Sequence, residues 1–88
     1  MNTSSRRDGR AQTQLRLALL TLLKGEELPG GSKRPWSIYA LAEIMSIGYQ
    51  TEEIIVFYLT KRGLLKLIRG RFIPTTAAYR VALMDGEL

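Results

Sequence analysis

The chain of 88 residues contains neither cysteine nor histidine. Without cysteine it has no disulfide framework and no thiolate ligand for a metal, and without histidine it lacks the commonest general base. Acid-base catalysis would be left to carboxylates, yet Glu52 and Glu53 are neighbours in a predicted helix and point in different directions. We therefore expect a protein that is not an enzyme and that binds no metal and no cofactor.

Long hydrophobic runs are also missing. The most apolar segment, residues 15–23, is too short to span a bilayer and starts too far from the N-terminus for a signal peptide. The sequence therefore predicts a soluble, cytoplasmic protein, in the host cell if a virus encodes it, with no membrane contact.

What the chain does have is a globular composition and an excess of positive charge. Hydrophobic residues make up 45% of the chain and charged residues 24%, which suits one small folded domain. Thirteen Lys and Arg against eight Asp and Glu leave a net charge of +5, a balance that attracts polyanions such as nucleic acid.

The first ten residues differ in composition from the rest. Residues 1–10 are polar, so we expect a flexible basic arm there and a single domain over residues 11–88. Strong helix formers over residues 11–24, ended by Gly25, predict the first helix. Its leucines surround more than one face, so it is either a central core helix or a helix that also contacts a partner subunit.

Glycine, proline and capping residues divide the remaining chain. They predict a loop over residues 25–37, a short helix over 38–46 with Ser37 as its N-cap and Gly48 as its breaker, and a third helix over 52–62 capped by Thr51 and ended by Gly63. After Gly63 the pattern predicts strands at 64–69 and 72–74 around a tight turn at Gly70-Arg71, then a last helix over 77–84 that Thr75 or Thr76 caps and Asp85-Gly86 ends.

This order of elements predicts a mainly α fold with a small β-hairpin, the winged helix-turn-helix arrangement α-α-α-β-β-α. Over residues 37–84 the chain resembles the winged helix-turn-helix regulators of the MarR and ArsR kind. The motifs that carry the resemblance are Leu41-Ala42, the turn Ile47-Gly48, Leu59 ahead of Gly63-Leu64-Leu65, and Phe72-Ile73-Pro74-Thr75 at the end of the hairpin.

The resemblance implies that the third helix lies in a major groove of DNA with Tyr49, Gln50 and Thr51 facing the bases. A Gln side chain pairs with adenine through two hydrogen bonds, and Thr offers a hydroxyl or touches a thymine methyl. The alternative is that Thr51 only caps the helix and Gln50 only solvates the turn.

Basic residues at three places are the candidate phosphate contacts. They are Lys61 and Arg62 at the end of the third helix, Arg69 and Arg71 in the hairpin, and Arg6, Arg7 and Arg10 in the arm. Each group also has an explanation without DNA, namely favourable charge at a helix C-terminus, a solvated hairpin tip, or a solubilising tail.

Two features of the third helix oppose DNA binding. Glu52 and Glu53 bring negative charge to its first turn, and Ile54, Phe57 and Tyr58 place bulky apolar groups outside the expected core stripe. One explanation that keeps DNA binding is that acidic residues stabilise a helix N-terminus and that one Glu can accept a hydrogen bond from cytosine N4. The alternative is that this helix contacts protein, for which such an apolar patch is typical.

The first hypothesis is a sequence-specific double-stranded DNA-binding transcriptional regulator, such as a repressor encoded by a phage or mobile element. It would act as a homodimer joined by Leu17, Leu20, Ala78 and Leu83. The alternative is a winged-helix protein-protein adaptor or inhibitor that acts on a host complex.

Overall fold

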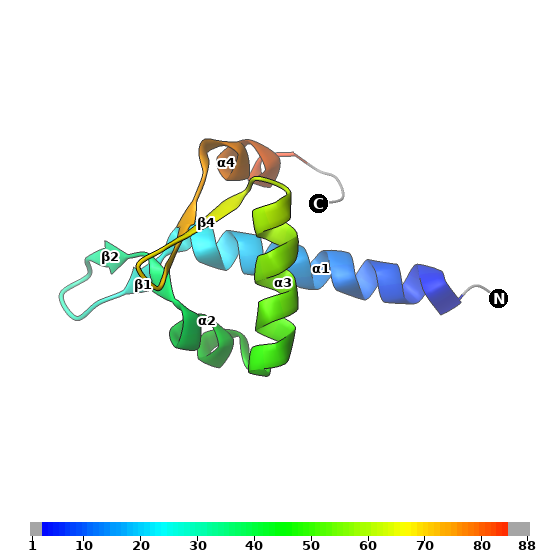
Figure 1. Ribbon diagram of the computed structural model, residues 1–88, viewed down its shortest axis with the longest axis horizontal. Coiled ribbons are helices and arrows are strands. Elements are labelled where there is room, and N and C mark those ends of the chain that lie inside the picture. Colours follow the sequence, from blue (N-terminus) through cyan, green and yellow to red (C-terminus); the bar gives the residue numbers. More distant parts are fainter. Residues whose placement is uncertain (1–2, 85–88) are drawn as a thin grey trace.

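The computed structural model describes residues 3–84, with side chains described from Thr13 onwards. Four helices and two small antiparallel sheets form one mixed α/β domain (Figure 1). In chain order the elements are α1 (Thr3–Lys24), β1 (Glu26–Glu27), β2 (Lys33–Arg34), β3 (Trp36–Ser37), α2 (Ile38–Met45), α3 (Tyr49–Lys61), β4 (Leu65–Ile68), β5 (Arg71–Pro74) and α4 (Thr76–Ala82).

Helix α1 begins at Thr3, so the backbone over residues 3–10 is helical where the sequence predicts a flexible arm. The segment contains no proline, and extending a helix already nucleated over residues 11–24 costs far less than starting one. Figure 1 shows this end of α1 reaching well past the other elements. The side chains of Arg6, Arg7 and Arg10 lie outside the described residues. Gly25, with φ +81°, ends the helix as predicted.

The segment predicted as a loop over residues 25–37 contains three short strands. β1 and β2 form a two-stranded hairpin, with Glu26 opposite Arg34. β3 instead pairs with β5, so that Trp36 lies opposite Phe72. Gly30 and Gly31, both with positive φ, supply the turn between β1 and β2.

Helices α2 and α3 meet at a tight turn. Ser37 caps α2 as predicted, because its hydroxyl accepts a hydrogen bond of 3.4 Å from the backbone N–H of Ala40. The helix ends at Ser46, which has φ +55°, rather than at Gly48. Gly48 is instead the N-cap of α3, so the prediction that Thr51 caps this helix is wrong, and Thr51 lies in the first turn.

The β4–β5 hairpin is confirmed, with its turn one residue earlier than predicted. Ile68 pairs with Arg71, which leaves Arg69 and Gly70 as the turn. Both have positive φ, the conformation that a two-residue hairpin turn favours. With β3 the hairpin forms a three-stranded sheet in the order β3-β5-β4. Thr75 is the N-cap residue of α4, but its hydroxyl donates to the carbonyl of Gly63 at 2.7 Å, which links α4 to the end of α3.

The core lies between α1, α3 and the three-stranded sheet. Its fully buried large side chains are Leu19, Leu22, Leu41, Leu59, Leu65 and Phe72. Ala78 also has no exposed surface and belongs to the core, which corrects its assignment to a dimer interface. The reason is that α4, the helix that carries Ala78, packs directly on α1.

Candidate nucleic-acid interface

Helix α3 has one buried face and one face open to solvent. Ile55 and Leu59 point into the core. Gln50, Ile54 and Phe57 repeat at three and four residues along the opposite side, where Ile54 is 65% and Phe57 67% exposed. No element in the described part of the chain covers this outer face, so it is available to a partner.

The three residues predicted to face bases occupy different environments. Gln50 is exposed on the outer face, whereas Thr51 is half-buried in the first turn. Tyr49 is exposed, but its ring stands edge-on to the ring of Tyr39 in α2, with 5.6 Å between the ring centroids. The structure therefore leaves Gln50 exposed on the outer face of α3 and turns Tyr49 toward α2.

The C-terminal end of α3 carries two cations at its surface. The Nζ of Lys61 lies 5.9 Å from the centroid of the Phe57 ring. The guanidinium of Arg62 lies 5.4 Å from the centroid of the Tyr58 ring and donates a hydrogen bond of 3.1 Å to its hydroxyl. Cation–π contacts of this kind orient a side chain without neutralising its charge, so both cations remain available to a phosphate.

Arg69 and Arg71, which sequence reasoning treats alike, have different roles. Arg69 is exposed at the hairpin tip and forms no ion pair with a described residue. Arg71 donates a hydrogen bond of 2.9 Å to the carbonyl of Pro35 and lies 4.0 Å from the Glu26 carboxylate. Glu26 in turn pairs with Arg34 at 2.8 Å. Arg71 therefore ties β5 to the β1–β2 hairpin rather than standing free for phosphate.

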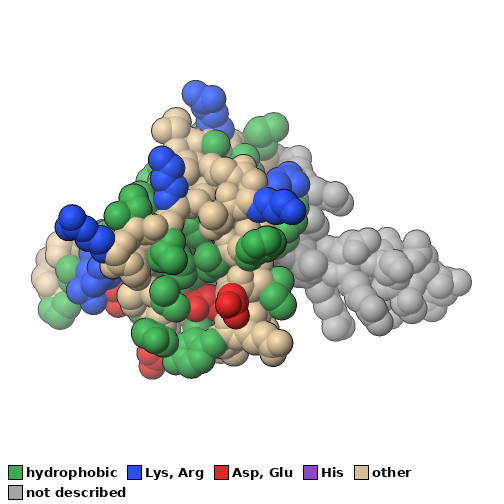
Figure 2. Space-filling model, in the orientation of Figure 1, with side chains coloured by type: hydrophobic (Ala, Val, Ile, Leu, Met, Phe, Trp, Pro, Cys, Tyr) green, Lys and Arg blue, Asp and Glu red, His purple; other side chains and the backbone are tan. Residues whose placement is uncertain are grey.

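Only two of the three side chains predicted to contact protein, Ile54, Phe57 and Tyr58, lie at the surface. Ile54 and Phe57 are exposed, but Tyr58 is half-buried and packs against the core. Leu67 and Ile68 in β4 are also exposed, and sequence reasoning missed them. Successive side chains of a strand point to opposite faces, and it is Leu67 that lines a pocket together with Glu53 and Val56 of α3. Figure 2 shows hydrophobic side chains gathered in the middle of one face of the molecule, with Lys and Arg side chains around its upper edge and on the side of the hairpin.

A pocket of about 380 Å³ opens between α2, the first half of α3 and β4. It is lined by Ile38, Tyr39, Tyr49, Glu52, Glu53, Val56, Leu67 and Phe72. Glu52 is only 3% exposed, and its Oε2 has no hydrogen-bond partner. Burial raises the pKa of this carboxyl, and a hydrogen bond from the backbone of Ala42 opposes that effect weakly.

The burial of Glu52 could have been predicted from its position in the sequence. It precedes Ile55 by three residues and Leu59 by seven, so it lies on the same helical stripe as these core side chains. Sequence reasoning treated it only as a charge in the first helical turn.

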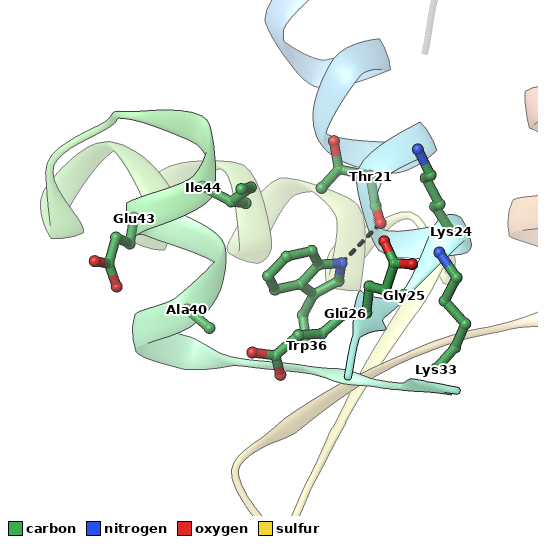
Figure 3. A pocket seen from close by; sticks show the side chains of 10 residues that line it. Thr21, Lys24, Gly25, Glu26, Lys33, Trp36, Ala40, Glu43 and Ile44 are labelled. Carbon is green, nitrogen blue, oxygen red and sulfur yellow. Dashed lines mark hydrogen bonds between the residues drawn. The ribbon is translucent and has the colours of Figure 1, made fainter. Parts of the chain in front are cut away.

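A second, more open pocket of about 590 Å³ lies beside Trp36, between the end of α1, the β1–β2 hairpin and α2 (Figure 3). The indole N–H of Trp36 donates to the carbonyl of Thr21 at 2.8 Å. Around it stand Lys24 and Lys33 together with the carboxylates of Glu26, Glu27 and Glu43. Because the polar atom of the indole is already occupied and the surrounding charges are mixed, this pocket offers no preference for one kind of ligand.

The predicted dimer residues other than Ala78 stay at the surface. Leu17 is 56%, Leu20 43% and Leu83 88% exposed. Arg16 holds α1 to α4 by a hydrogen bond of 3.1 Å from Nη2 to the carbonyl of Ala82. Leu17 and Leu20 on α1 and Leu83 at the end of α4 are therefore presented by two helices that are fixed to each other.

Comparison with protein-family models, with curated proteins and with solved structures gave no match to this chain. The described residues include no group of three or more acidic side chains arranged to hold a metal ion. None of the described helices is both long enough and apolar enough to cross a membrane.

Proposed function

We propose that this domain is a winged helix-turn-helix module that binds double-stranded DNA, with α3 in the major groove and the β4–β5 hairpin as its wing. The order α1, β3, α2, α3, β4, β5, together with the pairing of β3 on β5, supports this assignment. The observation that carries it is the uncovered outer face of α3, which has exposed cations at its C-terminal end and at the tip of the adjoining hairpin.

Each exposed group has a role in this proposal. Gln50 pairs with adenine, and Ile54 and Phe57 touch thymine methyl groups in the groove. Lys61 and Arg62 contact phosphates at one end of α3, and Arg69 reaches the backbone or the minor groove from the wing. Arg71 positions the wing and does not bind DNA.

We further propose that the protein works as a homodimer and regulates transcription from a two-fold symmetric site. The exposed Leu17, Leu20 and Leu83 form the surface that joins the two copies. In helix-turn-helix dimers the two recognition helices enter successive major grooves of a two-fold symmetric operator, and the proposal assigns this role to the two copies of α3.

A second candidate, a winged-helix adaptor, is favoured by one observation. Ile54 and Phe57 expose large apolar side chains on the outer face of α3, and exposed aromatic anchors of this kind dominate protein-protein interfaces.

Single substitutions on α3 separate the two candidates. If α3 contacts bases, Gln50→Ala should lower the discrimination between base pairs at one or two positions of a site selected from random duplexes. The expected loss in the binding free-energy difference is on the order of 1–3 kcal/mol. Phe57→Ser would then weaken DNA binding less, and Tyr79→Ser, which changes an exposed aromatic on α4, would leave it unchanged. Circular dichroism checks folding, and fluorescence anisotropy measures DNA binding.

The opposite pattern supports the adaptor. In that case Gln50→Ala leaves binding to the selected DNA intact, while Phe57→Ser but not Tyr79→Ser removes a protein captured from a host lysate.

A further inference from the structure

The pocket between α2, α3 and β4 buries a carboxylate that nothing in the described structure neutralises. Glu52 forms no ion pair with a described residue, and no Lys or Arg lines the pocket. Its Oε2 has no hydrogen-bond partner. An unpaired buried charge is costly, and a cation placed beside it would remove most of that cost.

The other lining groups define what kind of cation fits. The rings of Tyr39 and Tyr49 stand edge to face at 5.6 Å, and both line the pocket with Glu52. Tyrosine faces attract ammonium groups, most strongly when water is excluded. Ile38, Val56 and Leu67 supply an aliphatic wall for an apolar body.

Other classes of ligand fit less well. A hard metal ion such as Ca²⁺ or Mg²⁺ needs about six oxygen ligands, and the lining offers mainly aliphatic and aromatic groups. An anion would be repelled by Glu52 and Glu53. A neutral apolar molecule would leave the negative charge of Glu52 uncompensated. The volume of about 380 Å³ falls in the range of small-molecule sites.

We propose that this pocket is a binding site for a small organic cation, an alkylammonium whose charged end lies near Glu52 and beside the two tyrosines and whose apolar end contacts Val56 and Leu67. Glu52 is the group that selects the charge. The tyrosines orient the ammonium, and the exposed Glu53 at the edge of the pocket attracts the cation from solution.

The test is calorimetric titration of the whole protein, without DNA, with n-hexylammonium and with 1-hexanol as the uncharged analogue. The expected result is that hexylammonium binds at least about tenfold more tightly than hexanol, a difference of about 1.4 kcal/mol. Glu52→Gln should abolish this preference. Glu43→Gln, which changes an exposed glutamate outside the pocket, should leave it intact. The ring resonances of Tyr39 and Tyr49 should shift on binding in the wild-type protein.

Three outcomes would overturn the proposal. These are equal affinity for the amine and the alcohol, a preference that survives Glu52→Gln in a folded variant, and no binding of hexylammonium up to about 10 mM, the limit of a useful weak site. Since no DNA is present, this result stands or falls independently of the proposed function.

Discussion

At the scale of single residues, Glu52 is where charge and burial conflict. A carboxylate that is 3% exposed with one unpartnered oxygen destabilises the folded state whenever it is ionised. Its pKa is raised by burial above the ordinary value of 4.5, so the folded protein holds the proton more tightly than the unfolded chain. The contribution of Glu52 to stability is therefore favourable below the unfolded pKa and is lost as the pH rises through the folded pKa.

We accordingly predict that Glu52→Gln stabilises the protein at pH 7, by roughly 1 kcal/mol or about 4–8 °C in Tm for a domain of this size. The advantage over the wild type should shrink as the pH falls toward the ordinary pKa of a glutamic acid. Thermal melts of both proteins between neutral and acidic pH measure it, with Glu43→Gln as the control. A destabilised Glu52→Gln at pH 7, or a difference that is constant with pH, would show that the carboxylate is not under strain.

At the scale of elements, the two arginines of the β4–β5 hairpin, Arg69 and Arg71, have different roles. Arg69 at the tip has φ +51°, which Asn tolerates, so Arg69→Asn removes charge without disturbing the turn. We predict that it weakens binding to all duplexes about equally and reduces the salt slope by about one. Arg71→Gln should instead lower the Tm, because it removes the hydrogen bond to Pro35.

Anisotropy titrations at several salt concentrations and thermal melts of both variants measure the two effects. Arg69→Asn with unchanged DNA affinity would place the hairpin tip outside the interface. An Arg71→Gln variant that keeps its Tm but loses DNA affinity would reassign Arg71 as a phosphate contact.

Local chemistry made some elements predictable from the sequence and left others hidden. Ser37 caps α2 through its own hydroxyl, and the glycines at 25 and 63 end helices through their own backbone conformation, so all three were predictable from the sequence. Strand β3 spans two residues and is held by its pairing with β5, a contact distant in sequence that produces no periodic pattern. The prediction that Thr51 is the N-cap of α3 was wrong because glycine is about as favourable as threonine at an N-cap, and the helix begins after Gly48.

In the candidate site, too, some features could be predicted from the sequence and others could not. Composition and helical spacing identified the outer face of α3 and the cations at its end. The tethering of Arg71 and the burial of Ala78 depend on which elements pack together, and residue type alone carries no signal for either.

At the scale of the whole molecule, the exposed Leu17 and Leu20 of α1 predict self-association. At tens of micromolar, light scattering should give twice the chain mass of 9.9 kDa. Leu20→Glu should yield a monomer, because it places an uncompensated charge in the proposed interface. Leu67→Glu, an equally drastic change on the exposed hairpin, should leave the mass unchanged. A wild-type monomer, or a dimer that only Leu67→Glu disrupts, would contradict the proposal that the exposed leucines of α1 form the dimer interface.

The most direct test of DNA binding is the salt dependence of affinity for a random duplex, measured by fluorescence anisotropy of the wild-type protein. With Lys61, Arg62 and Arg69 on phosphates, the slope of log affinity against log salt should be about −2.7 per protomer, so that affinity falls roughly forty-fold between 50 and 200 mM salt. Affinity that does not change over this range, or no binding at 50 mM salt, would contradict the account.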